Sequence, residues 1–109
     1  MAEEFTGRLR EQVVIERAVR VPDASGNAAI NWVLRAAARA ALVPIERPAP
    51  LVGEARVRRP AYRVTMRSVT GLAFSDRLRW RGSHFRIEQF GSDPRMPGQM
   101  MLVIEELGA

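Results

Sequence analysis

Short runs of alternating apolar and polar residues recur along the chain, and they constrain its fold more than any other feature. Residues 9–20 place three apolar side chains on one face, Val13, Ile15 and Val19, and four polar ones on the other, Arg10, Gln12, Glu16 and Arg20. Residues 61–69 alternate in the same way, with Tyr62, Val64 and Met66 facing opposite to Arg63, Thr65 and Arg67. This period of two, with β-branched residues among the apolar positions, predicts β-strands.

Clusters of turn-forming residues separate further alternating runs. The segment PDASGN at 22–27 predicts a hairpin tip, and Ile30, Trp32 and Leu34 alternate after it. The segment GSDPRMPGQ at 91–99 predicts a second connector, followed by a closing strand with Leu102 and Ile104 facing inward. The sequence therefore predicts a series of strands joined by hairpin-like connections.

Residues 35–42, RAAARAAL, are ambiguous, because their composition favours a helix on propensity alone. However, they follow a strand pattern directly, lack a helix N-cap and lead to Pro44, which would break a helix. We favour an extended segment over residues 38–46 and leave the helix as the alternative.

The segment DRLRWRGSHFRIEQF at 76–90 mixes arginines with aromatic residues, which raises the question of nucleic-acid binding. A hairpin with Gly82-Ser83 as its two-residue type II′ loop puts Trp80 opposite Phe85 and Leu78 opposite Ile87 on one face. The other face then pairs Arg77 with Glu88, Arg79 with Arg86 and Arg81 with His84. Base stacking needs aromatic and basic groups to reach the same ligand, and here they point apart. We therefore interpret the aromatics as core.

These elements predict an all-β fold, a small sandwich or barrel of about six strands with one long central loop, forming a single domain over residues 1–109. The predicted core consists of Val13, Ile15, Trp32, Tyr62, Val64, Leu78, Trp80, Phe85, Ile87, Leu102 and Ile104.

The long loop is RPAPLVGEARVRRP at 47–60, with a short helical turn expected near residues 53–58. Long loops in compact domains are usually functional or disordered. The loop has more basic than acidic residues, so its arginines are our candidates for facing DNA in a channel: Arg47, Arg56, Arg58 and Arg59. A solvated loop, or a segment that inserts into an adjacent subunit, is the alternative.

The composition narrows the functional classes. All 17 basic residues are arginine and the net charge is +5, which favours salt-dependent attraction to polyanions and planar pairing with carboxylates. The absence of cysteine excludes disulfides and cysteine-based metal sites. We expect neither a membrane span nor a signal peptide, because no apolar window is long enough and the first residues are polar.

We find no constellation of residues suited to catalysis. His84 is the single histidine and sits beside a turn, and no phosphate-binding glycine loop or metal-ligand cluster occurs. Asp23, Asp76 and Asp93 lie in turn contexts, where aspartate caps backbone groups. We therefore expect no enzyme activity, no cofactor and no metal.

The order of several short motifs resembles the head–tail joining family of tailed bacteriophages. They are GRLREQVVIER at 7–17, the turn from Asp23 to Gly26, Trp32, Pro44 to Glu46, Arg63 to Arg67, Arg77 to Gly82, and Phe85 to Ile87. The likeness extends over residues 7–106. Each motif is weak alone, and their order and spacing carry the resemblance.

This resemblance implies a virion protein in the neck of a phage or gene transfer agent particle, assembled in the bacterial cytoplasm. Members form a homo-oligomeric ring of roughly six or twelve copies. The implied partners are the portal or an adaptor protein above the ring, a tail terminator or tail tube protein below it, and packaged double-stranded DNA held without sequence specificity. The resemblance also implies that the ring acts as adaptor or stopper below the portal, docks the tail and helps to retain or gate DNA in the channel.

Ring subunits need complementary side surfaces, and outward arginines paired with a neighbour's carboxylates would supply them. Our candidates for these subunit contacts are Arg63, Arg67, Arg79 and Arg86. The alternatives are a ring protein similar to a tail terminator, or a free-standing basic β-barrel that binds nucleic acid.

Overall fold

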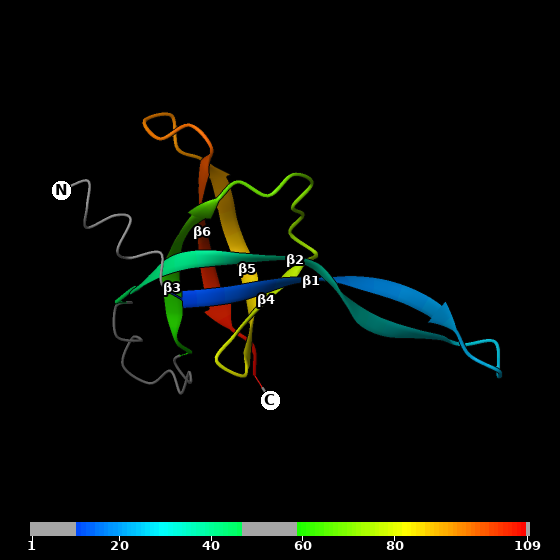
Figure 1. The fold of residues 1–109 in the computed structure, drawn as a ribbon. Helices are drawn as coiled ribbons and strands as arrows, with labels where there is room; N and C mark the ends of the chain where they lie inside the picture. Colours follow the sequence, from blue (N-terminus) through cyan, green and yellow to red (C-terminus); the bar gives the residue numbers. More distant parts are fainter. Residues whose placement is uncertain (1–10, 47–58, 109) are drawn as a thin grey trace.

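A computed structural model describes residues 11–46 and 59–108, which form a closed barrel of antiparallel strands (Figure 1). The strands are β1 (Glu11–Pro22), β2 (Ala28–Pro44), β3 (Ala61–Arg67), β4 (Arg77–Trp80), β5 (Ser83–Ser92) and β6 (Gln99–Glu106). Their order around the barrel is β1-β2-β3-β6-β5-β4. The predicted all-β fold is confirmed. The central loop lies outside the described residues except for Arg59 and Pro60, and so does the helical turn expected at 53–58.

The barrel interior is filled by the apolar sides of the alternating strands. The largest side chains with no or almost no exposure are Val13, Ile15, Val64, Met66, Leu78, Leu102 and Ile104. Phe85 and Ile87 are also buried, while Tyr62 and Trp80 are partly buried against this cluster. The period-two reading therefore assigned the inward faces of β1, β3, β4, β5 and β6 correctly.

The alanine-rich segment belongs to β2 and is extended, as favoured. Ala40 pairs with Glu11 of β1 on one side and with Met66 of β3 on the other, and it is fully buried. Ala36 and Ala38 also pack against the core. Small inward side chains suit a narrow closed barrel, in which large ones on every strand would not fit. This tertiary requirement overrides the helix propensity of alanine.

β1 and β2 continue past the barrel as a two-stranded arm, residues 17–34, which projects to one side (Figure 1). β1 pairs with β4 only from Val14 to Glu16, and β2 pairs with β3 only from Ala40 to Pro44. A register shift between Ile15 and Glu16 marks the base of the arm. Asp23 organises the tip by accepting hydrogen bonds from the amides of Ser25 and Asn27, both at 2.9 Å.

The arm corrects one predicted core residue. Trp32 is partly buried but lies on the arm, outside the core cluster. Its neighbours in the same alternating run, Ile30 and Leu34, are 56% and 68% exposed, and Val19 of β1 is exposed as well. Alternation assigns side chains to a face of a strand, but it does not reveal where that strand leaves the barrel.

The turn between β4 and β5 corrects the predicted register. Its two central residues are Arg81 and Gly82, with φ of 50° and 79°, as in a type I′ turn. Trp80 therefore pairs with Ser83 and Leu78 with Phe85, while Arg77 lies opposite Arg86 and Arg79 opposite His84. The predicted pairs of Trp80 with Phe85 and of Arg79 with Arg86 are wrong. Because the register differs by two residues, every side chain keeps its predicted face.

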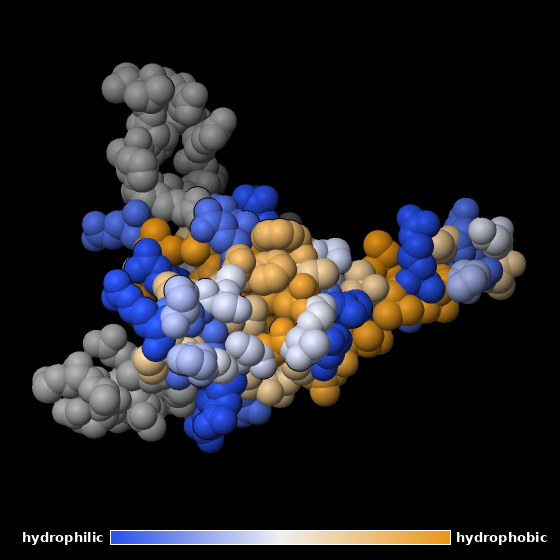
Figure 2. Space-filling model, turned by 90° about the horizontal axis from the view of Figure 1, so that it is seen from above, coloured by the Kyte–Doolittle hydropathy of each residue, from blue (hydrophilic) through white to orange (hydrophobic). Residues whose placement is uncertain are grey.

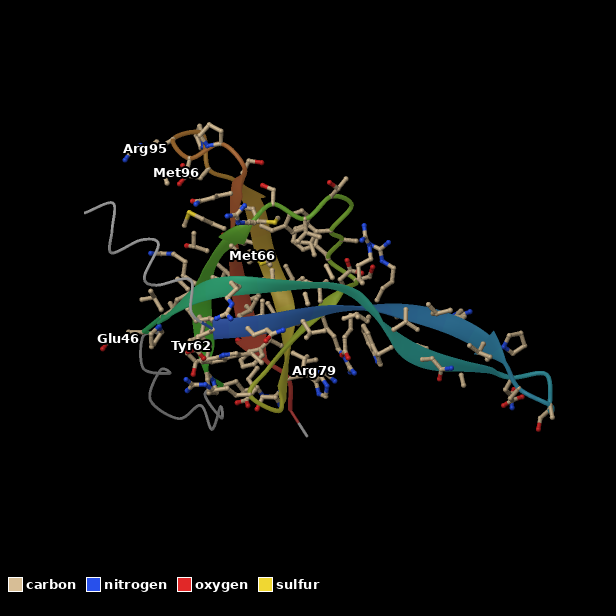
Figure 3. All side chains as sticks on the ribbon, in the orientation of Figure 1. Glu46, Tyr62, Met66, Arg79, Arg95 and Met96 are labelled. Atoms are coloured by element: carbon tan, nitrogen blue, oxygen red, sulfur yellow. The ribbon has the colours of Figure 1, made fainter. Side chains whose placement is uncertain are left out.

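The β5–β6 turn lies at one end of the barrel, and Figure 3 shows Arg95 and Met96 near its tip. Asp93 caps this turn by accepting a hydrogen bond from the amide of Arg95 at 2.9 Å. Within residues 11–46 and 59–108 there is no helix long and apolar enough to cross a membrane.

Candidate subunit interface

Glu16 at the base of the arm gathers the basic side chains of the β4–β5 hairpin. Its carboxylate accepts a hydrogen bond from Arg77 Nε at 2.8 Å and lies 3.5 Å from Arg79 Nη1 and 3.8 Å from His84 Nε2. Glu16 is only 8% exposed. Cross-strand pairing of Glu16 with Arg77 puts both side chains on the outside of the barrel. The ion pairs therefore join the arm to the hairpin.

Arg77 also covers one face of Trp32. Its guanidinium carbon lies 4.0 Å from the centre of a Trp32 ring, within the range of a cation–π contact. Arg77 is therefore held between a carboxylate and an indole, both from the arm strands. This arrangement fixes Trp32 beside the barrel and makes it unavailable for base stacking on that face.

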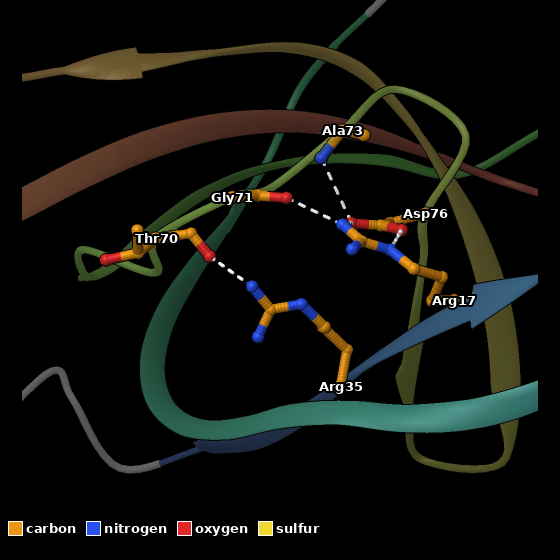
Figure 4. Close-up of polar contacts among 6 residues, drawn as sticks. All are labelled: Arg17, Arg35, Thr70, Gly71, Ala73 and Asp76. Atoms are coloured by element: carbon orange, nitrogen blue, oxygen red, sulfur yellow. Dashed lines mark hydrogen bonds and ion pairs between the residues drawn. The ribbon is translucent and has the colours of Figure 1, made fainter.

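A second set of contacts holds the arm to the loop before β4 (Figure 4). Arg17 donates to both carboxylate oxygens of Asp76, at 2.9 and 3.0 Å, and to the carbonyl oxygen of Gly71 at 2.6 Å. Arg35 donates to the carbonyl oxygen of Thr70. Gly71 has a φ of +78°, and a Cβ there would lie 2.8 Å from Arg35 Nη2, so glycine suits this close approach.

Asp76 is the buried centre of this set, with 2% exposure, and Oδ2 also accepts a hydrogen bond from the Ala73 amide at 3.0 Å. Burial on its own raises the pKa of Asp76. The hydrogen bonds from Arg17 and Ala73 and the charges of Arg17 and Arg35 outweigh burial, so the pKa lies below its ordinary value. The predicted capping role of Asp76 is correct. Its ion-pair partner Arg17 lies 59 residues away in the sequence, so no local sequence pattern predicts this pair.

Trp80 and Phe85 of the β4–β5 hairpin pack on each other and on Tyr62 of β3. Ring centroids of Tyr62 are 5.1 Å from Trp80 and 5.8 Å from Phe85, both edge to face. Trp80 Nε1 donates to Glu11 at 3.0 Å, and Arg81 stacks 4.8 Å above the indole. The hairpin therefore presents no open stacking platform of the kind that single-stranded nucleic acid requires.

The arginines predicted for subunit contacts fall into two groups. Arg79 and Arg86, on β4 and β5, already have carboxylates in their own chain: Arg86 Nη2 lies 3.0 Å from Glu105 and 3.8 Å from Glu88, and Arg79 approaches Glu16. Arg63 and Arg67 lie exposed on β3, with β6 between them and β5. The structure does not bring the four side chains together.

The candidates for facing DNA lie almost entirely beyond what the structure describes. Arg47, Arg56 and Arg58 are outside the described residues. Arg59 is exposed, and its guanidinium lies close to Gly108, near the C-terminal end of the chain. In the described part of the chain, no three histidine or acidic side chains are grouped so that they would hold a metal ion.

Among the described residues, exposed apolar side chains are concentrated on the arm, which sequence reasoning did not identify as a surface. The arm carries apolar side chains along its length up to a polar tip (Figure 2). The outer face of β5 and β6 is mixed, because Met101, 37% exposed, lies there near the polar side chains of Arg63 and Gln89. A shallow depression of about 330 Å³ lies on this face, lined by Arg63, Gln89, Gly91, Met101, Leu102 and Val103.

These features define a small closed β-barrel with a projecting arm that is ion-paired at its base and carries exposed apolar side chains along its length. The sequence profile of the family described as phage head completion protein matches residues 6–106. The chain belongs to this family, which confirms the resemblance to phage head–tail joining proteins. It is a structural protein of the head–tail connection of a phage-like particle.

A solved structure supports the fold. A chain in the structure titled "Virion of native gene transfer agent (GTA) particle" is 22% identical, with a TM-score of 0.58. The alignment covers 92% of this chain and 96% of that chain. No curated protein matches the chain.

Proposed function

We propose that the chain forms a ring in the head–tail connector below the portal, where it acts as stopper or adaptor. In this proposal the ring docks the tail, with the portal or an adaptor protein above it and a tail terminator or tail tube protein below it. The role is structural and not catalytic. The observation that carries the proposal is the family match, which extends over residues 6–106 and includes both the barrel and the arm.

The charge of the chain supports a place beside packaged DNA. The net charge is +5, and all of the basic residues are arginines. Positive side chains that contact phosphates are sufficient to hold DNA without reading its sequence. Free-standing nucleic-acid binding is disfavoured, because the hairpin aromatics are packed on one another and Arg77, Arg79 and Arg86 are near carboxylates. A ring similar to a tail terminator remains the second candidate, since the family match supports any ring at the head–tail junction.

The test is to make particles in cells that lack this chain and to examine them by electron microscopy and by nuclease protection of DNA. Loss of a stopper or adaptor should leave heads without tails, free tails of normal length and less protected DNA. Returning the wild-type chain should restore tailed particles. Tails of uncontrolled length would favour the terminator role, and normal tailed particles with protected DNA would contradict a connector role of either kind.

A further inference from the structure

The arm of each chain has exposed apolar side chains on both faces and no core of its own. Cross-strand partners share a face, so Ile30 and Leu34 lie on the same face as Trp32, while Val19, Val21 and Val33 lie on the other. Ile30 and Leu34 are the most exposed of the large apolar residues on the arm. A two-stranded hairpin is at best marginally stable in water unless a hydrophobic face is covered. The arm therefore has the properties of a segment that another surface covers after assembly.

The same chain carries a depression of mixed polarity on the far side of the barrel, with Met101 exposed in it. Val43, Arg63, Val103 and Gln89 form one cross-strand row on the outside of β2, β3, β6 and β5. Met101 and Gly91 pair in the next row. A Cβ at Gly91 would meet nothing within 4 Å, so the backbone there is open to a side chain from outside. The depression of about 330 Å³ lies across these two rows.

The strand order sets the relation between the two surfaces. Around the closed barrel β1-β2-β3-β6-β5-β4, β1 is three strands from β6 and β2 is three strands from β5. The arm strands and the β5–β6 face are therefore on opposite sides of the barrel, as far apart as six strands allow. Because the two surfaces are on opposite sides, a contact between two copies leaves one surface of each copy free and joins the copies head to tail. Head-to-tail contacts are the kind that generate rings when the rotation closes.

We infer that the Ile30–Leu34 face of the arm of one copy docks on the outer β5–β6 face of the next copy, with Ile30 and Leu34 over Met101 and Gly91. This inference rests on the proposed ring and names the surfaces that build it. In each copy, the Glu16–Arg77 and Arg17–Asp76 contacts hold the base of the arm against the barrel, so the arm projects in a fixed direction.

The absence of cysteine makes cross-linking a clean test. Particles carrying Ile30→Cys with Met101→Cys, treated with a short bis-maleimide, should give a ladder of multimers of this chain on a denaturing gel. The matched control is Ile30→Cys with Met96→Cys, which replaces a similarly exposed methionine at 40% with no contact to the depression, and it should give no ladder. Ile30→Cys alone should give no dimer. A dimer from Ile30→Cys alone, or a product joined to a protein of different mass, would overturn the inference.

A second pair of variants tests the same contact without cysteines, in case the cysteine variants fail to assemble. Leu34→Gln should lower the amount of ring in particles about tenfold or more, whereas Val33→Gln, adjacent in the chain but on the opposite face, should leave it unchanged. Both isolated chains should unfold at the wild-type temperature. A ring that forms normally with Leu34→Gln would overturn the inference and leave the proposed function intact. A wild-type chain found in particles without any ring would instead overturn the proposed function.

Discussion

At the scale of single residues, the Arg17–Asp76 pair beside Gly71 and Ala73 joins the arm to the loop before β4. Asp76 is buried and both of its carboxylate oxygens accept hydrogen bonds, Oδ1 from Arg17 and Oδ2 from Arg17 and the Ala73 amide, whereas an asparagine has only one such oxygen. Asp76→Asn keeps the size of the side chain and removes the charge. We predict a loss of about 1–3 kcal/mol in the free energy of unfolding, measured by chemical denaturation at neutral pH.

Asp23→Asn is the control for this variant. Asp23 accepts hydrogen bonds from backbone amides at the exposed tip of the arm, a turn position that asparagine also occupies well. The free energy of unfolding should therefore fall by less than about 0.5 kcal/mol in Asp23→Asn. Equal losses in the two variants would contradict the special role of Asp76.

The lowered pKa of Asp76 predicts how stability depends on pH. Its folded-state pKa lies below the unfolded-state value of about 3.9, so the ionised group stabilises the fold above about pH 4. That contribution is lost as the pH falls through the folded-state pKa. The difference in stability between wild type and Asp76→Asn, measured by denaturation from pH 7 downward, should therefore shrink below about pH 4. A constant difference across this range would contradict the assignment.

At the scale of elements, sequence patterns predicted which segments are strands and which side of β1, β3, β4, β5 and β6 faces the barrel interior. They did not predict the register of β4 and β5, because Arg81 adopts a positive φ that arginine rarely occupies, while Gly82 beside it is the obvious turn residue. They did not predict the arm either, since Ile30, Trp32 and Leu34 alternate as core residues do. The ion pairs of Glu16 and Asp76 join residues about 60 positions apart, and only the closed barrel brings them together.

The β4–β5 turn can be tested with two substitutions at one position. In a type I′ turn at Arg81-Gly82, asparagine at position 81 fits the positive φ and a β-branched residue does not. We predict that Arg81→Asn is more stable than Arg81→Val by about 1–2 kcal/mol. Both variants lose the contacts of Arg81 with Glu11 and Trp80, so these cancel in the comparison. A turn at Gly82-Ser83 would place residue 81 in a strand and favour valine.

At the scale of the whole molecule, the four outward arginines predicted for subunit contacts differ in their surroundings. Arg79 and Arg86 approach Glu16 and Glu105 within the chain, and reversing their charge places like charges together. Arg79→Glu with Arg86→Glu should therefore destabilise the isolated chain by about 1 kcal/mol. Arg63→Glu with Arg67→Glu, on exposed positions of β3, should leave the unfolding temperature unchanged and lower the yield of tailed particles.

Thermal unfolding of the isolated chain and a count of tailed particles distinguish the two double variants. Normal particle yield with Arg63→Glu and Arg67→Glu would show that β3 contributes no charged subunit contact.

The central claim is that this chain is a ring protein of the head–tail connector, and a cryo-electron microscopy reconstruction of the particle neck tests it most directly. The account predicts a closed ring of barrels directly below the portal, each with the six-strand order found here and an arm reaching the adjacent barrel. A neck that lacks this chain, or that holds it as isolated copies without contact between barrels, would contradict the account.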